Sequence, residues 1–337
     1  MRAVGYHQSQ PITAETSLVD LDLPEPVAAG RDLLVEVRAI SVNPVDTKMR
    51  MRAQPAEGSV SVLGWDVAGT VKAVGPEVTA FRPGDAVFYA GAIDRSGGNA
   101  ELHLVDERIV GPKPKSLGFA EAAALPLTAI TAWEMLFDRL KIRDAVPGAA
   151  HALLIIGGAG GVGSIAIQLA RKLTDVTVIA TASRPETQAW ATELGAHHVV
   201  DHGKPLAAQV AALGIGAPAF AFSTTHTGDH LADIVELLAP QGRFGLIDDP
   251  KTLDAVPLKR KSLSLHWELM FTRSLFQTAD IQAQGDLLAE VSRLVDAGTL
   301  RTTLAEHFGT INAANLKRAH ALLESNRAKG KIVLEGF

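Results

Sequence analysis

The sequence predicts an α/β protein in which a β-rich N-terminal part is followed by a doubly wound parallel sheet. In the first third of the chain, short apolar or alternating runs are separated by turn sequences such as "RPGD" and "SGG". From residue 151 onward, apolar runs alternate instead with amphipathic segments. Short strands with frequent turns are typical of a β-barrel or sandwich, and strand–helix alternation is typical of a parallel sheet covered by helices.

The strands of the first part are short and are expected at residues 33–41, 67–75, 85–91 and 100–106. The chain then becomes helical over residues 119–136. This helix is interrupted at Pro126, because proline lacks the amide proton that a helix interior needs. A broken helix of this kind is typical of a connection between domains.

The second part alternates strands with helices. Strands are expected at residues 151–158, 176–183, 197–201, 219–223 and 242–248, and helices at 162–173, 185–195, 205–213 and 228–239. The first of these helices spaces its apolar residues three and four positions apart, as a helix packed on a sheet does. Two amphipathic helices at 287–295 and 316–323 and a strand at 331–337 complete the chain.

The 337 residues are 47% hydrophobic and 20% charged, which is enough apolar material for more than one core. The net charge of -5 and the isoelectric point near 6.1 argue against nucleic acid or an anionic membrane as a partner. Cysteine is absent, which excludes disulfides, iron–sulfur clusters and a cysteine nucleophile. Because the N-terminus carries no apolar signal region, we expect a cytoplasmic protein.

Residues 145–170 carry no Asp, Glu, Lys or Arg and are numerous enough to cross a bilayer. Glycines cluster in the middle of this stretch, however, and a buried strand–turn–helix explains them better than a membrane span does. We therefore expect no contact with a membrane.

The glycines form the pattern Gly158-x-Gly160-x-x-Gly163 between an apolar strand and an amphipathic helix. In that context the pattern indicates a dinucleotide site. Glycine permits a tight turn, close approach of the backbone to a pyrophosphate and close helix–strand packing, and the helix N-terminus attracts the anion. The alternative is a glycine-rich turn without a ligand. The expected cofactor-binding residues here are Gly158, Ala159, Gly160, Gly161, Val162 and Gly163.

The choice of cofactor is expected to be made at the end of the second strand, in "TASRPET". NAD sites usually have Asp or Glu there for the ribose 2′-hydroxyl, whereas this chain has Ser183 and Arg184. A guanidinium forms charge-assisted hydrogen bonds with a 2′-phosphate. We therefore predict NADPH, with a solvated surface role for Arg184 as the alternative.

Several blocks together resemble the medium-chain dehydrogenase/reductase superfamily, and within it the quinone oxidoreductase-like branch that includes zinc-type alcohol dehydrogenase-like proteins. The blocks are "SVNPVDTK", "LGWDVAG", "FRPGDAV", "AALPLTAITAW", "GGAGGVGSIAIQLA", "ELGAHHVVD" and "AKGKIVLE". The resemblance implies a GroES-like β-barrel catalytic domain at 1–126, a Rossmann NADP-binding domain at 127–268, and a C-terminal segment at 269–337 that returns to the catalytic domain.

The chain departs from the zinc-dependent members of this superfamily at their ligand positions. Those members have a Cys-His element where this chain has "NPVD", and Gly-His-Glu where it has Gly64-Trp65-Asp66. We therefore expect no metal. Trp65 is expected either to form an apolar wall for a flat acceptor or simply to pack in the core. Asp66 is expected to orient nearby backbone or to pair with a local cation.

The loss of the metal ligands bears on the substrate. Zinc polarises a carbonyl as a Lewis acid, and a simple ketone loses that stabilisation without it. A quinone or an α,β-unsaturated carbonyl takes hydride at carbon and spreads the charge to an oxygen that hydrogen-bond donors can hold. We predict NADPH-dependent, zinc-independent reduction of such a small molecule. The alternatives are an alcohol/aldehyde dehydrogenase with an unrecognised metal site and a non-catalytic NADPH-binding protein.

The resemblance suggests three further catalytic candidates besides Trp65. Asn43 is expected to donate its amide to a developing oxyanion, or else to form a turn before Pro44. Lys48 stands where the related pattern has an aromatic residue, and is expected to donate a proton, to bind an anionic substrate, or to lie on the surface. Thr128 matches a helix position against the nicotinamide, with a hydrogen bond to its own backbone as the alternative.

The resemblance also extends the cofactor site beyond the glycine loop. The expected positions are Ser223 and Thr224, Leu246 and Ile247, Arg273 and Ser274, and Lys331, whose ammonium is expected near a phosphate. Residues 261–271 have the character of an edge strand, and family members commonly pair this strand across a two-fold axis. We therefore expect a homodimer.

Overall fold

The computed structural model describes all residues from 1 to 337, and the chain forms two compact units. Residues 1–130 and 271–337 form the first unit, and residues 131–270 form the second. Both ends of the chain therefore contribute to one unit. The functional domain boundaries predicted after residues 126 and 268 remain predictions.

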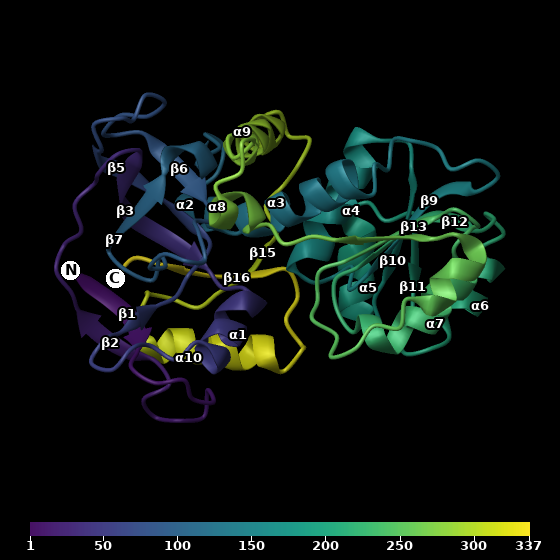
Figure 1. The fold of residues 1–337 in the computed structure, drawn as a ribbon, viewed down its shortest axis with the longest axis horizontal. Coiled ribbons are helices and arrows are strands. Elements are labelled where there is room, and N and C mark those ends of the chain that lie inside the picture. Colours follow the sequence, from purple (N-terminus) through teal and green to yellow (C-terminus); the bar gives the residue numbers. More distant parts are fainter. The chain divides into compact units, whose positions relative to one another are not determined.

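The first unit is built mainly from β-strands (Figure 1). Its larger sheet has the order β15-β16-β3-β5-β6-β8, with β7 also paired to β3, and its smaller sheet has the order β2-β1-β4. The strands are β1 (Arg2–Tyr6), β2 (Val19–Asp22), β3 (Asp32–Ser41), β4 (Ser61–Val62), β5 (Val67–Val74), β6 (Ala86–Tyr89), β7 (Leu102–Asp106), β8 (Gly111–Pro112), β15 (Leu304–His307) and β16 (Lys331–Glu335).

Strand β16 joins the two ends of the chain. It runs antiparallel to β3, and the register sets Val333 opposite Ser41. The residue at the start of β16, Lys331, consequently lies near the end of β3, where helix α1 begins. This long-range pairing assembles the polar site described below.

Helices of the first unit cover its sheets. They are α1 (Pro44–Arg52), α2 (Phe119–Ala123), α8 (Thr272–Phe276), α9 (Ala283–Asp296) and α10 (Ala313–Glu324), with α3 (Pro126–Trp133) starting in this unit. Helix α10 packs on α1, and α9 packs on β8. The predicted interruption at Pro126 is found, because α2 ends at Ala123 and α3 begins at the proline.

The second unit is a six-stranded sheet of order β11-β10-β9-β12-β13-β14 in which every pairing is parallel. Helices α4, α5, α6 and α7 lie around this sheet, and α6 contacts α7 (Figure 1). The α/β prediction is confirmed. The elements are β9 (Ala150–Ile156), α4 (Gly161–Leu173), β10 (Thr177–Thr181), α5 (Pro185–Glu193), β11 (His198–Val200), α6 (Leu206–Ala212), β12 (Pro218–Ser223), α7 (Thr227–Leu237), β13 (Arg243–Leu246) and β14 (Ser264–Trp267).

The central strand β9 explains the charge-free stretch of the sequence. Residues 152–156 are all buried, because neighbouring strands and helices cover both faces of a parallel sheet. Leu154 and Ile156 pack in the same apolar cluster as Phe244 of β13. The glycine loop and α4 follow directly. None of the helices combines the length and the apolar character needed to span a bilayer.

The elements that were not predicted include β1, β2, α8 and β15. Each has only four or five residues. Strand β15 exposes Glu306 and His307, and the five residues of α8 are too few to display a helical period. Their local patterns are therefore too short to distinguish from loops.

Candidate active site and cofactor site

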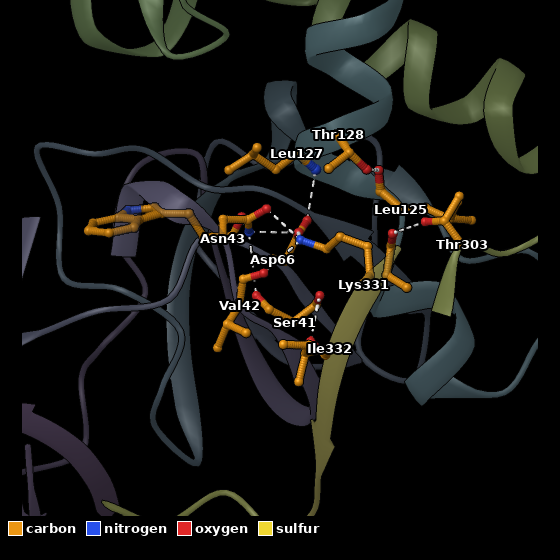
Figure 2. A network of polar contacts seen from close by, with 12 residues as sticks. Ser41, Val42, Asn43, Asp66, Leu125, Leu127, Thr128, Thr303, Lys331 and Ile332 are labelled. Atoms are coloured by element: carbon orange, nitrogen blue, oxygen red, sulfur yellow. Dashed lines mark hydrogen bonds and ion pairs between the residues drawn. The ribbon is translucent and has the colours of Figure 1, made fainter. Parts of the chain in front are cut away.

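A buried ionic network lies in the first unit, at the carboxyl end of β3 (Figure 2). Asp66 is its centre and has no exposed surface. One carboxylate oxygen, Oδ2, accepts from Lys331 Nζ at 2.9 Å and from Asn43 Nδ2 at 2.8 Å. The other, Oδ1, accepts from the backbone amide of Leu127 at 2.7 Å. Asp66 therefore binds three segments that are far apart in the sequence.

Helix α3 benefits from this arrangement. Its first residue is Pro126, which has no amide proton, so the amide of Leu127 is the first N–H of the helix. The Asp66 carboxylate accepts that N–H and also faces the positive end of the helix. Asp66 thus orients backbone and pairs with a cation, which are the two roles expected from the sequence.

Asp46 brings a second carboxyl group to the network. Its oxygens accept from the backbone amide of Asn43 at 2.6 Å and from that of Gly64 at 3.0 Å, and it too is fully buried. Burial raises the pKa of Asp46 to about 7, against the opposing effects of the Asn43 hydrogen bond and the Lys331 charge. Burial also raises the pKa of Asp66, and Lys331 opposes the rise. Two carboxyl groups thus share one ammonium.

The side chain of Asn43 is buried and takes part in the network. The residue is 1% exposed, its Nδ2 donates to Asp66, and its Oδ1 accepts from Lys331. It also stands at the N-cap of α1, directly before Pro44. This position is the one expected of a turn-forming asparagine. The second Nδ2 proton has only the carbonyls of Ser41 and Trp65 nearby, each at 3.5 Å, and the predicted donation to an oxyanion remains a prediction.

Lys331 is likewise committed within the first unit. Its ammonium donates to Val42 O at 2.9 Å, to Asn43 Oδ1 and to Asp66 Oδ2, and the residue is 3% exposed. An ammonium has three protons, and all three are used. The predicted contact with a cofactor phosphate would displace one of these acceptors, and it remains a prediction.

The hydroxyl of Thr128 follows the alternative named for it. The residue is buried, and Oγ1 donates to the carbonyl of Leu125 one helical turn earlier at 3.1 Å. Figure 2 shows this hydroxyl turned toward Leu125, away from Asp66. Lys48 is half-buried on α1 and is not among the residues that line the cavity described next.

Trp65 packs in the first unit, and its expected role as a wall for a flat acceptor remains a prediction. Its indole Nε1 donates to Ala92 O at 3.1 Å. Its ring packs edge-on against the ring of Phe271, with 6.2 Å between the ring centroids. It also lines a cavity of about 300 Å³. The other lining residues are Met49, Val60, Ser61, Val62, Ile93, Asp94, Arg95 and Ser96.

The loop that forms one wall of this cavity is held by a buried histidine. His103 contacts Ser96 O through Nε2 at 2.8 Å and the Tyr89 hydroxyl through Nδ1 at 3.0 Å. Burial lowers the pKa of His103 to about 4, so the ring is neutral at pH 7. Arg95, in the same loop, pairs with Asp32 at 2.8 Å. The sequence did not point to these residues, since no local motif marks the loop.

In the second unit, the glycine loop joins β9 to α4, as predicted. Gly157 has φ +80°, in the left-handed region. A Cβ on Gly163 would lie 2.2 Å from Gly157 O, and one on Gly158 would lie 2.7 Å from the Cβ of Ala180. These three glycines are required by backbone conformation or by packing.

Gly160 is different. A Cβ there would meet nothing closer than 3.4 Å, and its φ of -73° suits any residue. Neither packing nor conformation requires glycine at this position, which lies at the N-cap of α4. The amides of Gly161, Val162 and Gly163 follow in the first turn of α4, where a helix has no internal acceptors for its N–H groups. The loop therefore fits the pyrophosphate of a dinucleotide, which needs close backbone approach at the second glycine of the pattern.

Hydroxyl groups at the neighbouring strand ends fix the loop. Thr181 accepts from the amide of Gly157 through Oγ1 at 3.0 Å and from that of Gly158 through its carbonyl at 3.1 Å. Thr224 donates from Oγ1 to Ile156 O at 2.8 Å. Ser223 is buried and donates to Thr225 O. Thr181 was not predicted, because a threonine inside an apolar strand gives no local signal.

Arg184 lies at the end of the β10 segment, at the N-cap of α5. Its side chain is 34% exposed and its Nε pairs with Glu186 at 3.1 Å, while Ser183 beside it is exposed. The adjacent strand ends carry Leu246, which is buried, and Ile247, whose amide donates to Ser223 O at 3.3 Å.

Arg273 and Ser274 belong to helix α8 of the first unit. Arg273 Nε pairs with Asp280 at 3.0 Å, and the buried Ser274 donates to Phe271 O at 3.1 Å. Both side chains therefore have partners within α8 and the turn that follows it. Their predicted contact with the nicotinamide remains a prediction.

Comparisons with known proteins agree with this anatomy. The alcohol dehydrogenase GroES-like domain family matches residues 29–131, and the zinc-binding dehydrogenase family matches residues 194–334. A zinc-type alcohol dehydrogenase-like protein of Staphylococcus aureus is 38% identical over 99% of each chain. A quinone oxidoreductase of Pseudomonas aeruginosa is 32% identical over 92% of this chain and 93% of its own.

A solved structure is closer still. It is that of a Rhizobium etli CFN 42 protein provisionally called a zinc-dependent alcohol dehydrogenase, with 66% identity, a TM-score of 0.99, and coverage of 100% of this chain and 98% of that one. Fold, glycine loop and similarity define an oxidoreductase of the medium-chain dehydrogenase/reductase superfamily. Within it, the chain belongs to the family of zinc-type alcohol dehydrogenase-like proteins. The predicted resemblance and the predicted GroES-like and Rossmann folds are confirmed.

The zinc that these names imply does not fit the site. Protein zinc sites use cysteine, histidine and carboxylate ligands. No group of three or more such residues that could hold a metal ion occurs anywhere in the chain. At the position of the family's Gly-His-Glu element, the Asp66 carboxylate already pairs with the Lys331 ammonium, whose charge would repel a divalent cation.

Proposed function

We propose that this protein is a zinc-independent, NADPH-dependent reductase of quinones or α,β-unsaturated carbonyls. The observation that carries the proposal is the Asp66–Lys331–Asn43 network, which replaces a metal centre with a hydrogen-bonded ion pair. Conjugated acceptors need less electrophilic help than simple ketones do, because the charge of the added hydride spreads to a distant oxygen.

The cofactor assignment is supported by the second unit. The free space at Gly160 and the amides at the start of α4 suit a pyrophosphate. Arg184 and Ser183, with no acidic residue between β10 and Glu186, suit a 2′-phosphate. When bound, NADPH would supply the hydride.

The acceptor site is supported by the cavity beside Trp65. Trp65, Met49 and Ile93 contribute apolar side chains to a lining that is otherwise largely polar, and Arg95 and Ser96 offer polar groups for the oxygen of an acceptor. Small-molecule sites combine apolar side chains with polar groups that orient the ligand. In this scheme Lys48, which precedes the cavity-lining Met49 on α1, remains the candidate proton donor to the reduced acceptor.

The proposal is tested by following NADPH absorbance over a panel of quinones and enones, with simple ketones, aldehydes and alcohols as the contrast. We expect oxidation of NADPH by the conjugated acceptors only, and slower reaction with NADH. Tight binding of NADPH without turnover on any acceptor would overturn the catalytic assignment. An NADH preference would overturn the cofactor assignment.

One observation keeps a second candidate in view. The relatives are named zinc-type, so metal-dependent alcohol or aldehyde oxidation is the competing activity. Measurement of total metal in purified protein separates the two, since the competing activity requires about one equivalent of bound metal.

We also propose a homodimer formed through β14. This strand is at the edge of the parallel sheet, and Trp267 at its end is 52% exposed, as is Leu269 beyond it. An unpaired edge flanked by exposed apolar side chains is a common site of association across a two-fold axis. Light scattering at micromolar concentration should give twice the chain mass, and a monomeric mass would contradict the proposal.

A further inference from the structure

Three histidines gather at the edge of the second unit that also carries Arg184. His202 follows β11, His226 follows β12, and His230 lies in the first turns of α7. The rings of His202 and His230 are 6.4 Å apart between centroids, at an interplanar angle of 63°. Both are half-buried, whereas His226 is exposed and bonds to Thr225 Oγ1 at 2.7 Å. The network in the first unit does not use any of them.

The permanent charges on the side of His202 are those of Arg184 and Asp201. Arg184 and His202 follow β10 and β11, which are neighbouring parallel strands, so both lie at the carboxyl edge of the sheet. Burial lowers the pKa of His202, and His230, His226 and Arg184 lower it further, while Asp201 opposes them. His202 is neutral at pH 7 in the cofactor-free protein.

Three acidic groups lie on the side of His230, and backbone amides bind two of them. Burial lowers the pKa of His230, His226 lowers it further, and Asp229, Asp233 and Asp248 oppose this. The Asp233 oxygens accept from two backbone amides of α6 at 3.1 and 3.2 Å, and Asp248 accepts from the Thr227 amide at 2.9 Å.

On the β11 side, Asp201 accepts from the Gly203 amide at 2.9 Å and pairs with Lys204 at 3.6 Å. The carboxylates are thus largely committed to backbone amides and to Lys204. Further negative charge near His202 and His230 would therefore come from the ligand.

We propose that His202 and His230 form a proton-coupled part of the 2′-phosphate site, so that binding of NADPH, but not of NADH, takes up protons. The inference rests on the proposed function, since it assumes that Arg184 binds this phosphate. A phosphate dianion beside Arg184 adds two negative charges to a region that holds two neutral imidazoles. Protonation of the rings neutralises that charge.

The sign of the pH dependence follows from linkage. A group that is neutral in the free protein and protonated in the complex makes binding tighter as the pH falls through the interval between its two pKa values. The 2′-phosphate itself gains a proton near pH 6, which acts in the opposite direction. The effect is therefore expected between about pH 6.5 and 8, where the preference for NADPH over NADH should rise by about three- to tenfold as the pH falls.

The direct test is calorimetric titration of the full-length protein at pH 7 in two buffers of different ionisation enthalpy. The probes are 2′,5′-ADP and 5′-AMP, which differ only in the 2′-phosphate. We expect net proton uptake with 2′,5′-ADP and none with 5′-AMP. His202→Gln and His230→Gln should each reduce the uptake, whereas the control His266→Gln, on β14 at the other edge of the sheet, should leave it unchanged.

The two proposals fail in different ways. If 2′,5′-ADP binds more tightly than 5′-AMP but without proton uptake, the proton coupling is wrong and the NADPH assignment stands. Equal uptake in the wild type and both histidine variants would also overturn the coupling. If 2′,5′-ADP binds no more tightly than 5′-AMP, the cofactor assignment itself is wrong, and the inference falls with it.

Discussion

Asp66 is the residue on which the first unit depends most. It connects the end of β3, the start of α3 and the start of β16 through three hydrogen bonds, with no solvent contact. A buried ion pair is weak evidence for net stability by itself, but removing one partner leaves a buried charge without compensation. The two partners should therefore be strongly coupled.

Lys331→Met tests that coupling. It should lower the unfolding free energy of the first unit by about 3–5 kcal/mol, because Asp66 loses its counter-ion. The double variant Asp66→Asn/Lys331→Met should recover part of the loss. As a control, Arg2→Met breaks the exposed pair with Glu101 and should cost less than about 1 kcal/mol. Denaturant unfolding of these three variants and of Asp66→Asn alone measures the coupling, and additive effects of the two buried substitutions would contradict it.

Asp46 makes stability depend on pH. Its folded pKa of about 7 lies above its ordinary value of 3.8, so between these values the folded state binds more protons than the unfolded state. Its contribution is therefore present at low pH and is lost as the pH rises toward 7, by at most about 1.4 kcal/mol per pH unit.

In Asp46→Asn this contribution should disappear. Unfolding measured from pH 4.5 to 8 should give a flatter curve for the variant than for the wild type, even though the amide loses one of the two backbone hydrogen bonds. Thr47→Ala, a substitution of the next residue on α1, should keep the wild-type slope. Identical slopes for Asp46→Asn and the wild type would show that Asp46 does not hold the proton.

Arg184 is the residue that should decide between NADPH and NADH. Arg184→Asp replaces a phosphate-binding cation by a carboxylate that repels the 2′-phosphate and can accept from a ribose hydroxyl. The preference for NADPH should fall more than tenfold, measured as the ratio of kcat/KM values for the two cofactors. Lys172→Asp, the same change of charge on the exposed side of α4, should leave the ratio intact.

The residue types of the site could be predicted from the sequence, but several roles could not. Asn43, Trp65 and Asp66 stand out locally, whereas the partner of Asp66 is 265 positions away. Only the register of β16 on β3 brings Lys331 there. Asn43 and Lys331 were expected to contact ligands. Their burial and their contact with each other depend on the tertiary fold, which the local sequence does not show.

At the scale of elements, the turn from β9 to α4 separates two uses of glycine. Gly163 is required by packing, since an added Cβ would lie 2.2 Å from Gly157 O. An added Cβ on Gly160 would have no protein atom closer than 3.4 Å. The two positions should therefore respond differently to the same substitution.

Gly163→Ala should destabilise the second unit, because the start of α4 must move away from the loop. Gly160→Ala should leave the melting temperature nearly unchanged and yet weaken NADPH binding at least tenfold, since the methyl group fills the space assigned to the pyrophosphate. Thermal unfolding together with a fluorescence titration separates stability from affinity. Unimpaired binding by Gly160→Ala would mean that the free space is not the cofactor site.

The longer elements were predicted because their apolar residues form a recognisable pattern. Helix α4 and the strands of the parallel sheet repeat their apolar residues at helical spacing or as continuous buried runs. Elements of four or five residues, such as α8 and β15, are too short to show a repeating pattern of apolar residues. The cavity beside Trp65 was also missed, because a loop after β6 closes it against β4 rather than any regular element.

For the whole molecule, different features of the sequence determine the fold and the proposed chemistry. The β-rich unit and the parallel sheet follow from periodicity and are shared with relatives that are named for zinc. The residues of the first unit's polar site do not suit zinc and instead form a closed ionic network. Fold alone therefore does not decide the reaction, and the site must.

The most direct measurement is the rate of NADPH oxidation by a conjugated enone after chelator treatment has brought the metal content far below one equivalent. Our account predicts that this rate equals that of untreated protein and that added Zn²⁺ does not increase it. Loss of activity on metal removal, with recovery on addition of Zn²⁺, would contradict the claim that an ion pair has replaced the metal.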